Sequence, residues 1–305
     1  MKPIFKNLSE GRLKAGWRIT LFVILFWILS SSIFLIKPLF KEVSKRDFLN
    51  NYSLLIVAIL SISATIAVAL ARKNLDKRNI KSLGLKFNRQ SLKDLVFGFL
   101  LSGIMAAAFL GIASLLGLVH INSFEFVSLE FARSNSNGYV DFISYFSFGF
   151  LMIVLIEHVL VGYWEELVFR GYLFQNMKDG LGLVWAVIIS CLLYGIIHSA
   201  NPNATILSTI IIIFFGFLRL YGYLITNMLW LSMGMHIGWN FFQSPIFGFA
   251  ASGHQHATLI KLTINDPEWL SGGSFGPEGS LLIIPILFLA LAVMRIWGRQ
   301  SKANY

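Results

Sequence analysis

Long apolar runs separated by short polar segments dominate the chain. Runs of a length that can cross a bilayer lie at residues 19–36, 53–71, 95–119, 142–164 and 181–197. A last run, 281–294, is short but extends through Arg295-Ile296-Trp297. The stretch 204–242 is too long for one span, because about 20 residues cross the hydrocarbon core, and Arg219-Leu220-Tyr221-Gly222 interrupts it. We therefore expect two helices there, separated at these four residues. The pattern predicts an all-α polytopic membrane protein with about eight transmembrane helices.

Composition supports this class and argues against nucleic acid as a partner. Of the 305 residues, 56% are hydrophobic and 13% are charged, whereas an average soluble domain has about 25% charged residues. The net charge is +10, but lysines and arginines gather at the ends of apolar runs and form no stripe with interleaved aromatic residues. The single cysteine, Cys191, lies within an apolar run, which is typical of a small buried side chain.

The basic residues also predict the orientation of the chain. With the N-terminus inside, most of them face the cytoplasm, including the eight from Arg72 to Lys93 and also Arg170 and Arg219. We expect a multi-pass protein of the cell membrane with both termini in the cytoplasm, and a first apolar segment retained as a signal anchor. Residues 1–305 are expected to form a single membrane domain with its catalytic helices in 142–242, and residues 254–279 a surface loop.

Charged residues at the end of the fourth run are the strongest sign of function. There the sequence reads Trp164-Glu165-Glu166-Leu167-Val168-Phe169-Arg170. A charge at the bilayer centre costs roughly 2.5–3.5 kcal/mol, so such groups are functional by default. If the helix continues, Glu166 and Arg170 are at i, i+4 and pair, while Glu165 points about 100° away and is free for catalysis. Taken alone, the same cluster could also end a span at the membrane interface.

Two histidine patterns follow on later apolar runs. Tyr194 precedes His198 by four residues, and His236 precedes Asn240 by four, which places each pair on one helix face. A glutamate and a histidine can orient and deprotonate a water molecule, and a histidine with an asparagine amide can donate to a developing oxyanion. Together with Glu165, these groups could hydrolyse an amide bond.

The ordered set of motifs resembles the CPBP family of intramembrane proteases (CAAX proteases and bacteriocin-processing enzymes, also called the Abi family). That family is marked by Glu-Glu-x-x-x-Arg, Phe-x-x-x-His and His-x-x-x-Asn on successive helices. The corresponding residues here are, in order, Glu165-Glu166 with Arg170, Tyr194 with His198, and His236 with Asn240. Tyr194 replaces the usual Phe and keeps its aromatic ring. Residues Arg12–Arg18 are also similar to the N-terminal segment of bacterial members.

The resemblance implies an eight-helix membrane fold and an intramembrane endopeptidase that cleaves a membrane-associated protein or peptide. Its implied roles are water activation by Glu165 and His198, oxyanion stabilisation by His236 and Asn240, and support by Glu166 and Arg170. We expect no cofactor. Glu165, His198 and His236 could hold zinc, but the sequence lacks the His-Glu-x-x-His pair of soluble zinc peptidases. A prenylated tail, a bacteriocin leader and a membrane-protein terminus all remain open as substrates.

Two other functions remain open, a non-catalytic membrane scaffold and a proton-coupled transporter using the same polar residues. A transporter predicts inverted repeats or broken helices, and the sequence shows neither.

The predicted span ends also raise a difficulty. Glu165 falls near the cytoplasmic end of the fourth span, whereas His198 falls near the opposite end of the fifth. They meet only if the helices tilt or if Glu165 lies deeper than hydropathy indicates.

Overall fold

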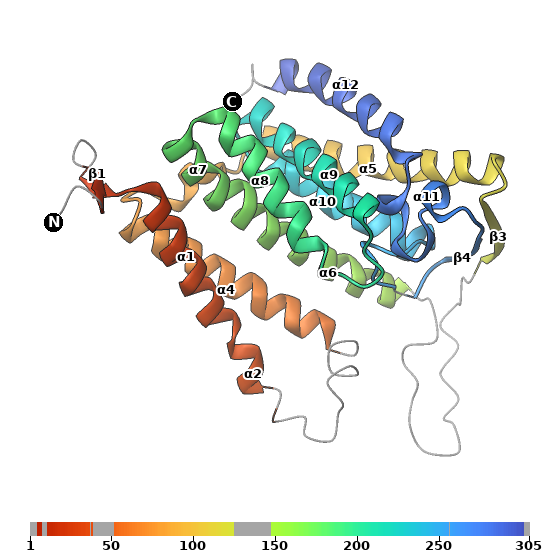
Figure 1. Ribbon diagram of the computed structural model, residues 1–305, viewed down its shortest axis with the longest axis horizontal. Coiled ribbons are helices and arrows are strands. Elements are labelled where there is room, and N and C mark those ends of the chain that lie inside the picture. The colour runs from red at the N-terminus through yellow and green to blue at the C-terminus, as the bar shows by residue number, and fades with distance from the viewer. Residues whose placement is uncertain are drawn as a thin grey trace.

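The computed structural model describes residues 5–7, 11–36, 38, 52–124, 148–255 and 257–301. Helices make up most of this part of the chain and lie side by side in an elongated bundle (Figure 1). The longer helices are α1 (Ala15–Ser30), α4 (Ser53–Asn74), α5 (Arg89–Leu115), α6 (Phe148–Glu166), α8 (Leu183–His198), α9 (Ile206–Thr226), α10 (Trp230–Phe241) and α12 (Ile283–Ser301). The all-α prediction is confirmed.

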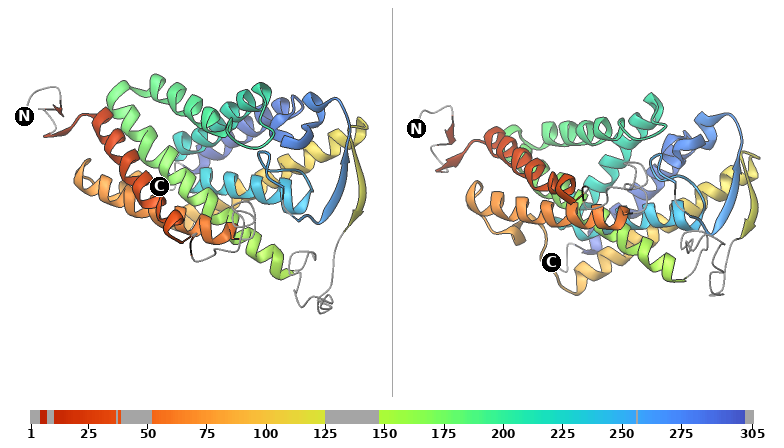
Figure 2. Two further views of the ribbon diagram at one scale, coloured as in Figure 1. Left: turned by 60° about the horizontal axis from the view of Figure 1, so that its bottom comes forward. Right: turned by 90° about the horizontal axis from the view of Figure 1, so that it is seen from below.

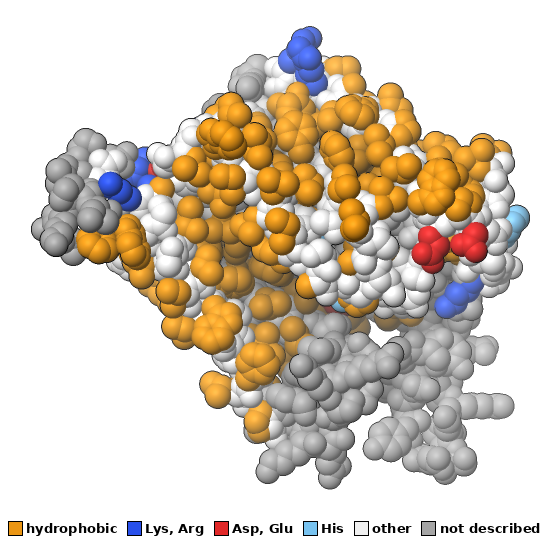
Figure 3. All heavy atoms as spheres, in the orientation of Figure 1, with side chains coloured by type: hydrophobic (Ala, Val, Ile, Leu, Met, Phe, Trp, Pro, Cys, Tyr) orange, Lys and Arg blue, Asp and Glu red, His pale blue; other side chains and the backbone are white. Residues whose placement is uncertain are grey.

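Several helices are suited to cross a membrane. Five described segments are long and apolar enough: Ala15–Ile36, which includes α2 (Ser32–Ile36), and helices α4, α5, α9 and α12; α8 is apolar but shorter. Hydrophobic side chains cover most of the face shown in Figure 3, with charged side chains near its margins. Such a surface suits lipid, and the chain is a polytopic membrane protein. The number eight stays a prediction.

Helix α6 does not end at the glutamates. A π-helical segment, η3 (Leu167–Leu173), and then α7 (Phe174–Leu181) continue it as far as Gly182, which has a φ of 80° and joins it to α8. Glu165 therefore lies 17 residues before this turn and His198 lies 16 residues after it. Because α7 and α8 pack against each other and a helix rises about 1.5 Å per residue, the two residues reach similar depths. This continuation removes the difficulty raised by hydropathy.

The predicted helix break at Arg219-Leu220-Tyr221-Gly222 is wrong. Helix α9 runs through these residues without interruption, and Asn227, with a φ of 56°, ends it before α10 begins. Arg219 is only 3% exposed, so it lies inside the protein and not in a cytoplasmic turn. The pattern was misleading because a charged residue that has buried partners can stay within a helix.

Helix α10 packs very closely against α5 through glycines. A Cβ added at Gly234 would lie 2.1 Å from the Leu95 carbonyl oxygen, which is far inside contact distance. One added at Gly238 would lie 2.4 Å from the Phe99 carbonyl oxygen. Small residues allow such close approach of helix backbones in membranes. This contact fixes the helix that carries His236.

Short strands and a folded loop complete the described structure. Strand β1 (Lys6–Asn7) pairs with β2 (Arg12–Leu13), and β3 (Val119–Phe124) pairs with β4 (Ile260–Ile264), both antiparallel. After β4 come the short helices α11 (Glu268–Ser271), η5 (Gly273–Phe275) and η6 (Pro277–Gly279). The expectation of a plain surface loop is wrong here, because Ser271, Phe275 and Glu278 are buried. The Glu278 carboxylate contacts the buried side chains of Trp239 and Arg219, which holds this segment inside the protein.

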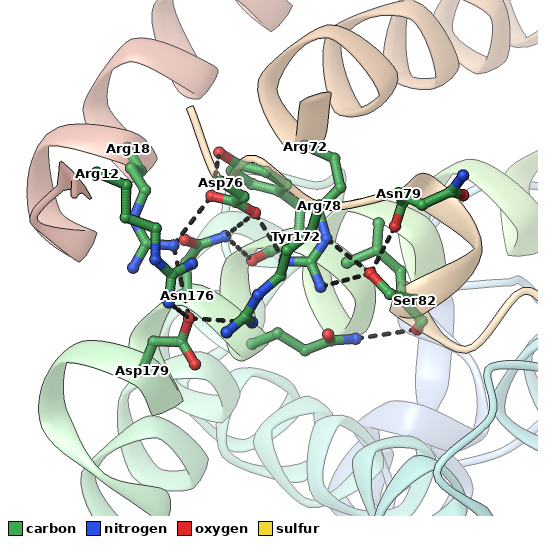
Figure 4. A network of polar contacts seen from close by, with 12 residues as sticks. Arg12, Arg18, Arg72, Asp76, Arg78, Asn79, Ser82, Tyr172, Asn176 and Asp179 are labelled. Atoms are coloured by element: carbon green, nitrogen blue, oxygen red, sulfur yellow. Dashed lines mark hydrogen bonds and ion pairs between the residues drawn. The ribbon is translucent and has the colours of Figure 1, made fainter. Parts of the chain in front are cut away.

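An ionic network joins α1 to α4 and α7 at one end of the bundle (Figure 4). Asp76 accepts hydrogen bonds from Arg18 Nη1 at 3.0 Å and from Arg72 Nη1 at 2.7 Å, and its side chain is fully buried. Asp179, in α7, accepts from Arg12 Nη2 at 3.0 Å. The N-terminal segment Arg12–Arg18 is thus attached to the same long helix that carries the glutamates.

Candidate active site

Glu165 is the centre of a polar cluster built from three helices. Its Oε2 accepts a hydrogen bond from the Tyr194 hydroxyl at 3.0 Å. The same oxygen lies 4.0 Å from His198 Nε2 and 3.8 Å from His236 Nε2. The carboxylate remains 13% exposed. The structure therefore brings together Glu165 of α6, His198 of α8 and His236 of α10.

His198, the last residue of α8, has a defined tautomer. Its Nδ1 lies 2.8 Å from the carbonyl oxygen of Tyr194, one turn earlier. A carbonyl oxygen only accepts, so Nδ1 carries the proton, and the neutral ring has its lone pair on Nε2. Two hydrogen-bond acceptors, His198 Nε2 and Glu165 Oε2, then face each other at 4.0 Å. That distance exceeds a direct hydrogen bond and fits a bridging water molecule.

Glu166 has different partners from its neighbour. Its carboxylate is fully buried, and Oε1 lies 3.1 Å from Arg170 Nη1 and 3.0 Å from His236 Nδ1. Arg170 Nη2 also donates to the Gly216 carbonyl oxygen at 3.0 Å. The predicted i, i+4 contact is thus present even though a π-helical segment begins between the two residues. This pair joins α6 to both α9 and α10.

Asn240 lies on α10 one turn after His236 and is half-buried. In the part of the chain that the structure describes, no hydrogen bond joins its amide to another residue. The i, i+4 spacing places it on the same helix face as His236. Its amide is therefore available to a bound substrate.

The sequence analysis missed two residues of this cluster. Arg219 Nη1 donates a hydrogen bond to the Tyr194 hydroxyl, and Arg219 Nη2 lies 3.9 Å from Glu278 Oε1. The apolar pattern alone predicts Arg219 in a cytoplasmic break and Glu278 in a surface loop. Arg170, also counted as cytoplasmic, is buried as well. The rule that singled out Glu165, an ionisable residue within an apolar run, would also have identified Arg219.

Histidine and carboxylate side chains such as those of this cluster can also hold a metal ion. Within the described ranges, no group of three or more His, Cys, Asp or Glu side chains is arranged to hold a metal ion. The proposed zinc ligands Glu165, His198 and His236 are included in those ranges. The expectation that no cofactor is needed stays a prediction.

Comparison with known proteins decides the family. Residues 148–242 match the family described as type II CAAX prenyl endopeptidase Rce1-like. This segment is a domain of the CAAX protease (CPBP) family. The matched segment extends from α6 to the end of α10 and contains all seven motif residues, whereas Glu278 lies outside it. No curated protein matches the chain.

The match at residues 148–242 confirms the resemblance drawn from the three motifs. It also gives the reaction class, because this is a family of hydrolases that cleave peptide bonds. Together with the apolar helices, it makes the chain an intramembrane endopeptidase acting on a protein or peptide.

Proposed function

We propose that Glu165 and His198 activate the water that attacks the peptide bond, and that His236 and Asn240 stabilise the resulting oxyanion. The observation that carries this proposal is the position of Glu165 Oε2, within 4.0 Å of Nε2 of two histidines on separate helices. Three helices converge on one carboxylate oxygen, as water activation in a protein interior requires.

Water activation follows from the acceptors that face each other. A water molecule between Glu165 and His198 donates one O–H to the carboxylate and the other to Nε2. Its lone pair then points away from both and attacks the substrate carbonyl carbon. As the new C–O bond forms, one water proton passes to Glu165. Glu165 returns this proton to the leaving nitrogen as the C–N bond breaks.

Two residues of α10, His236 and Asn240, stabilise the oxyanion. His236 Nδ1 donates to Glu166, so Nε2 can also donate only when the ring carries a second proton. The buried Glu166 carboxylate balances that charge at 3.0 Å. The Asn240 amide supplies a second donor on the same face. One such donor is worth about 10²–10³ in kcat.

The same proposal covers the setting of the enzyme. Residues 1–305 act as one membrane domain with the catalytic helices in 142–242, in the cell membrane, with both termini in the cytoplasm. The basic residues from Lys73 to Lys93 support this orientation after the buried Arg72, Arg170 and Arg219 are set aside. Catalysis uses no metal ion.

The test compares peptide termini in membranes from cells that carry the wild type or Glu165→Gln. This substitution removes the charge and keeps the shape of the side chain. We expect a set of cleaved termini to disappear in the variant at an unchanged protein level, which also identifies the substrate. Glu268→Gln, the same change at an exposed site in α11, should preserve the termini. A metal chelator should not reduce cleavage by the purified wild type.

Identical termini in wild type and Glu165→Gln cells, under conditions where the wild type functions, would remove the basis for proteolysis. The non-catalytic scaffold and the proton-coupled transporter would then be the better interpretations. Loss of cleavage on chelation, restored by added zinc, would contradict the metal-free mechanism and favour zinc held by Glu165, His198 and His236.

A further inference from the structure

A line of buried side chains connects Glu278 to Glu165. The line runs from Glu278 of η6 through Arg219 of α9 and Tyr194 of α8 to Glu165 of α6. Its three outer members, Glu278, Arg219 and Tyr194, are each at most 3% exposed. Four elements distant in sequence thus meet in one series of polar contacts.

The direction of each hydrogen bond follows from the donors available. A guanidinium group has donors only, so the Tyr194 oxygen accepts from Arg219. The single hydroxyl proton of Tyr194 is then committed to Glu165 Oε2. Glu165 must therefore accept this bond. Arg219 therefore determines that Tyr194 is the donor and Glu165 the acceptor of the hydrogen bond between them.

Glu278 determines where the Arg219 charge is balanced. Glu278 Oε1 accepts from Trp239 Nε1 at 3.0 Å, and Oε2 accepts from the Ser252 hydroxyl. The carboxylate is therefore held in place beside Arg219, with Oε1 3.9 Å from Arg219 Nη2. Without Glu278, we expect the buried Arg219 to form a direct ion pair with Glu165. The Glu165 carboxylate would then not be free to act as the base.

The aromatic ring of Tyr194 is held independently of its hydroxyl. The Arg170 guanidinium carbon lies 4.4 Å from the ring centroid, and the Phe169 ring packs edge-on at 5.1 Å. A phenylalanine at this position would keep these contacts and lose only the link to Arg219 and Glu165. The hydroxyl can thus be removed without removing the packing.

We propose that Tyr194, Arg219 and Glu278 form a positioning relay that orients the Glu165 side chain as the base. The inference rests on the proposed role of Glu165. It adds three positioning residues that do not contact the substrate, and one of them, Glu278, lies outside the matched segment 148–242.

The first test is Tyr194→Phe in the purified full-length protein, assayed on the peptide identified by its termini. Loss of one hydrogen bond to a charged group should lower kcat roughly tenfold. KM should stay within about twofold, since Tyr194 does not bind substrate. Tyr163→Phe is the matched control, because its hydroxyl lies 3.0 Å from Thr65 Oγ1 and takes no part in the relay. A normal kcat in Tyr194→Phe would overturn the relay.

The second test asks whether the members act together. Glu278→Gln should also lower kcat with KM nearly constant. The double variant of Tyr194 and Glu278 should be no slower than the slower single variant, because either change interrupts the same relay. Losses that multiply would show independent effects and contradict the proposal.

An infrared measurement tests the relay without an activity assay. The carboxylate band of Glu165 is the one that is present in the wild-type spectrum and absent from the spectrum of Glu165→Gln. We expect this band to shift in Tyr194→Phe and Glu278→Gln but not in Tyr163→Phe. An unshifted band overturns the relay whether or not the protein cleaves peptides. A shifted band with identical termini in wild type and Glu165→Gln supports the relay and rejects the proteolytic role alone.

Discussion

Glu165 and Glu166 are adjacent in sequence, yet their surroundings differ in kind. Glu166 is fully buried between Arg170 and His236, with contacts of 3.1 and 3.0 Å. Glu165 is partly exposed and lies 3.8–4.0 Å from two histidine nitrogens. Removing one partner from a buried ion pair costs about 3–5 kcal/mol, so Glu166 is suited to hold helices together. The looser contacts of Glu165 leave space for water.

At the residue scale, the proposed oxyanion site predicts the behaviour of Asn240→Asp. The substitution keeps the shape of the side chain and replaces the amide donor with an acceptor. We expect kcat to fall by about 10²–10³, as for other lost oxyanion donors. Because no hydrogen bond ties this amide to other described residues, the midpoint of thermal unfolding should change little. Near-normal kcat in a correctly folded Asn240→Asp protein would exclude Asn240 from the mechanism.

At the element scale, glycines decide how α10 is held. Gly234 and Gly238 meet the backbone of α5, and on another side a Cβ at Gly162 of α6 would lie 2.6 Å from Ile237 Cγ1. Helix α10 is thus enclosed by two neighbours that leave no space for a methyl group. This packing sets the distance between Glu165 and His236, because the two lie on the helices that meet there.

This packing predicts that Gly238→Ala separates α5 from α10. The Phe99 carbonyl oxygen is backbone and cannot move aside alone, so overpacking should destabilise the protein by about 1–3 kcal/mol. We also expect a marked loss of kcat, measured with the thermal unfolding midpoint on the same preparation. Gly111→Ala in α5 is the control, since an added Cβ there meets nothing within 4 Å. Equal behaviour of the two variants would show that the close approach is not needed.

On the scale of the whole molecule, the ionic network and the active site hold different regions of the long helix formed by α6, η3 and α7. Figure 2 shows α1 and α4 lying alongside each other against this helix. Asp76 joins them through Arg18 and Arg72, and the Tyr172 hydroxyl of η3 lies 3.4 Å from Asp76 Oδ1. The N-terminal helices are thus attached to the long helix that carries Glu165, at a distance from Glu165 itself.

This arrangement predicts that Asp76→Asn affects stability more than catalysis. Loss of the carboxylate leaves Arg72 buried without its counter-charge and leaves Arg18 only its longer contact with Asp179 at 3.5 Å, which should lower the free energy of unfolding by about 3 kcal/mol. Thermal unfolding in detergent measures this change, and kcat of the folded fraction should stay within about twofold. Asp266→Asn, the same substitution at an exposed site, should leave both unchanged. Wild-type stability of Asp76→Asn would contradict a structural role for the network.

The sequence by itself determined the class of the protein and the local contacts. Hydropathy adds up residue by residue along each run, so it identified an all-α membrane protein without knowledge of the fold. The contact between Glu166 and Arg170 followed from helix periodicity alone. The three ordered motifs were sufficient to indicate the family.

Which charges are buried, and how deep each residue proposed for catalysis lies, depends on the tertiary structure. Arg219 and Glu278 looked like a break and a loop because their partners are 25 or more residues away in the chain, and hydropathy contains no information on distant partners. The similar depths of Glu165 and His198 depend on a π-helical segment that carries the helix past Arg170. The energy of a buried charge depends on the groups around it, and folding alone brings those groups together.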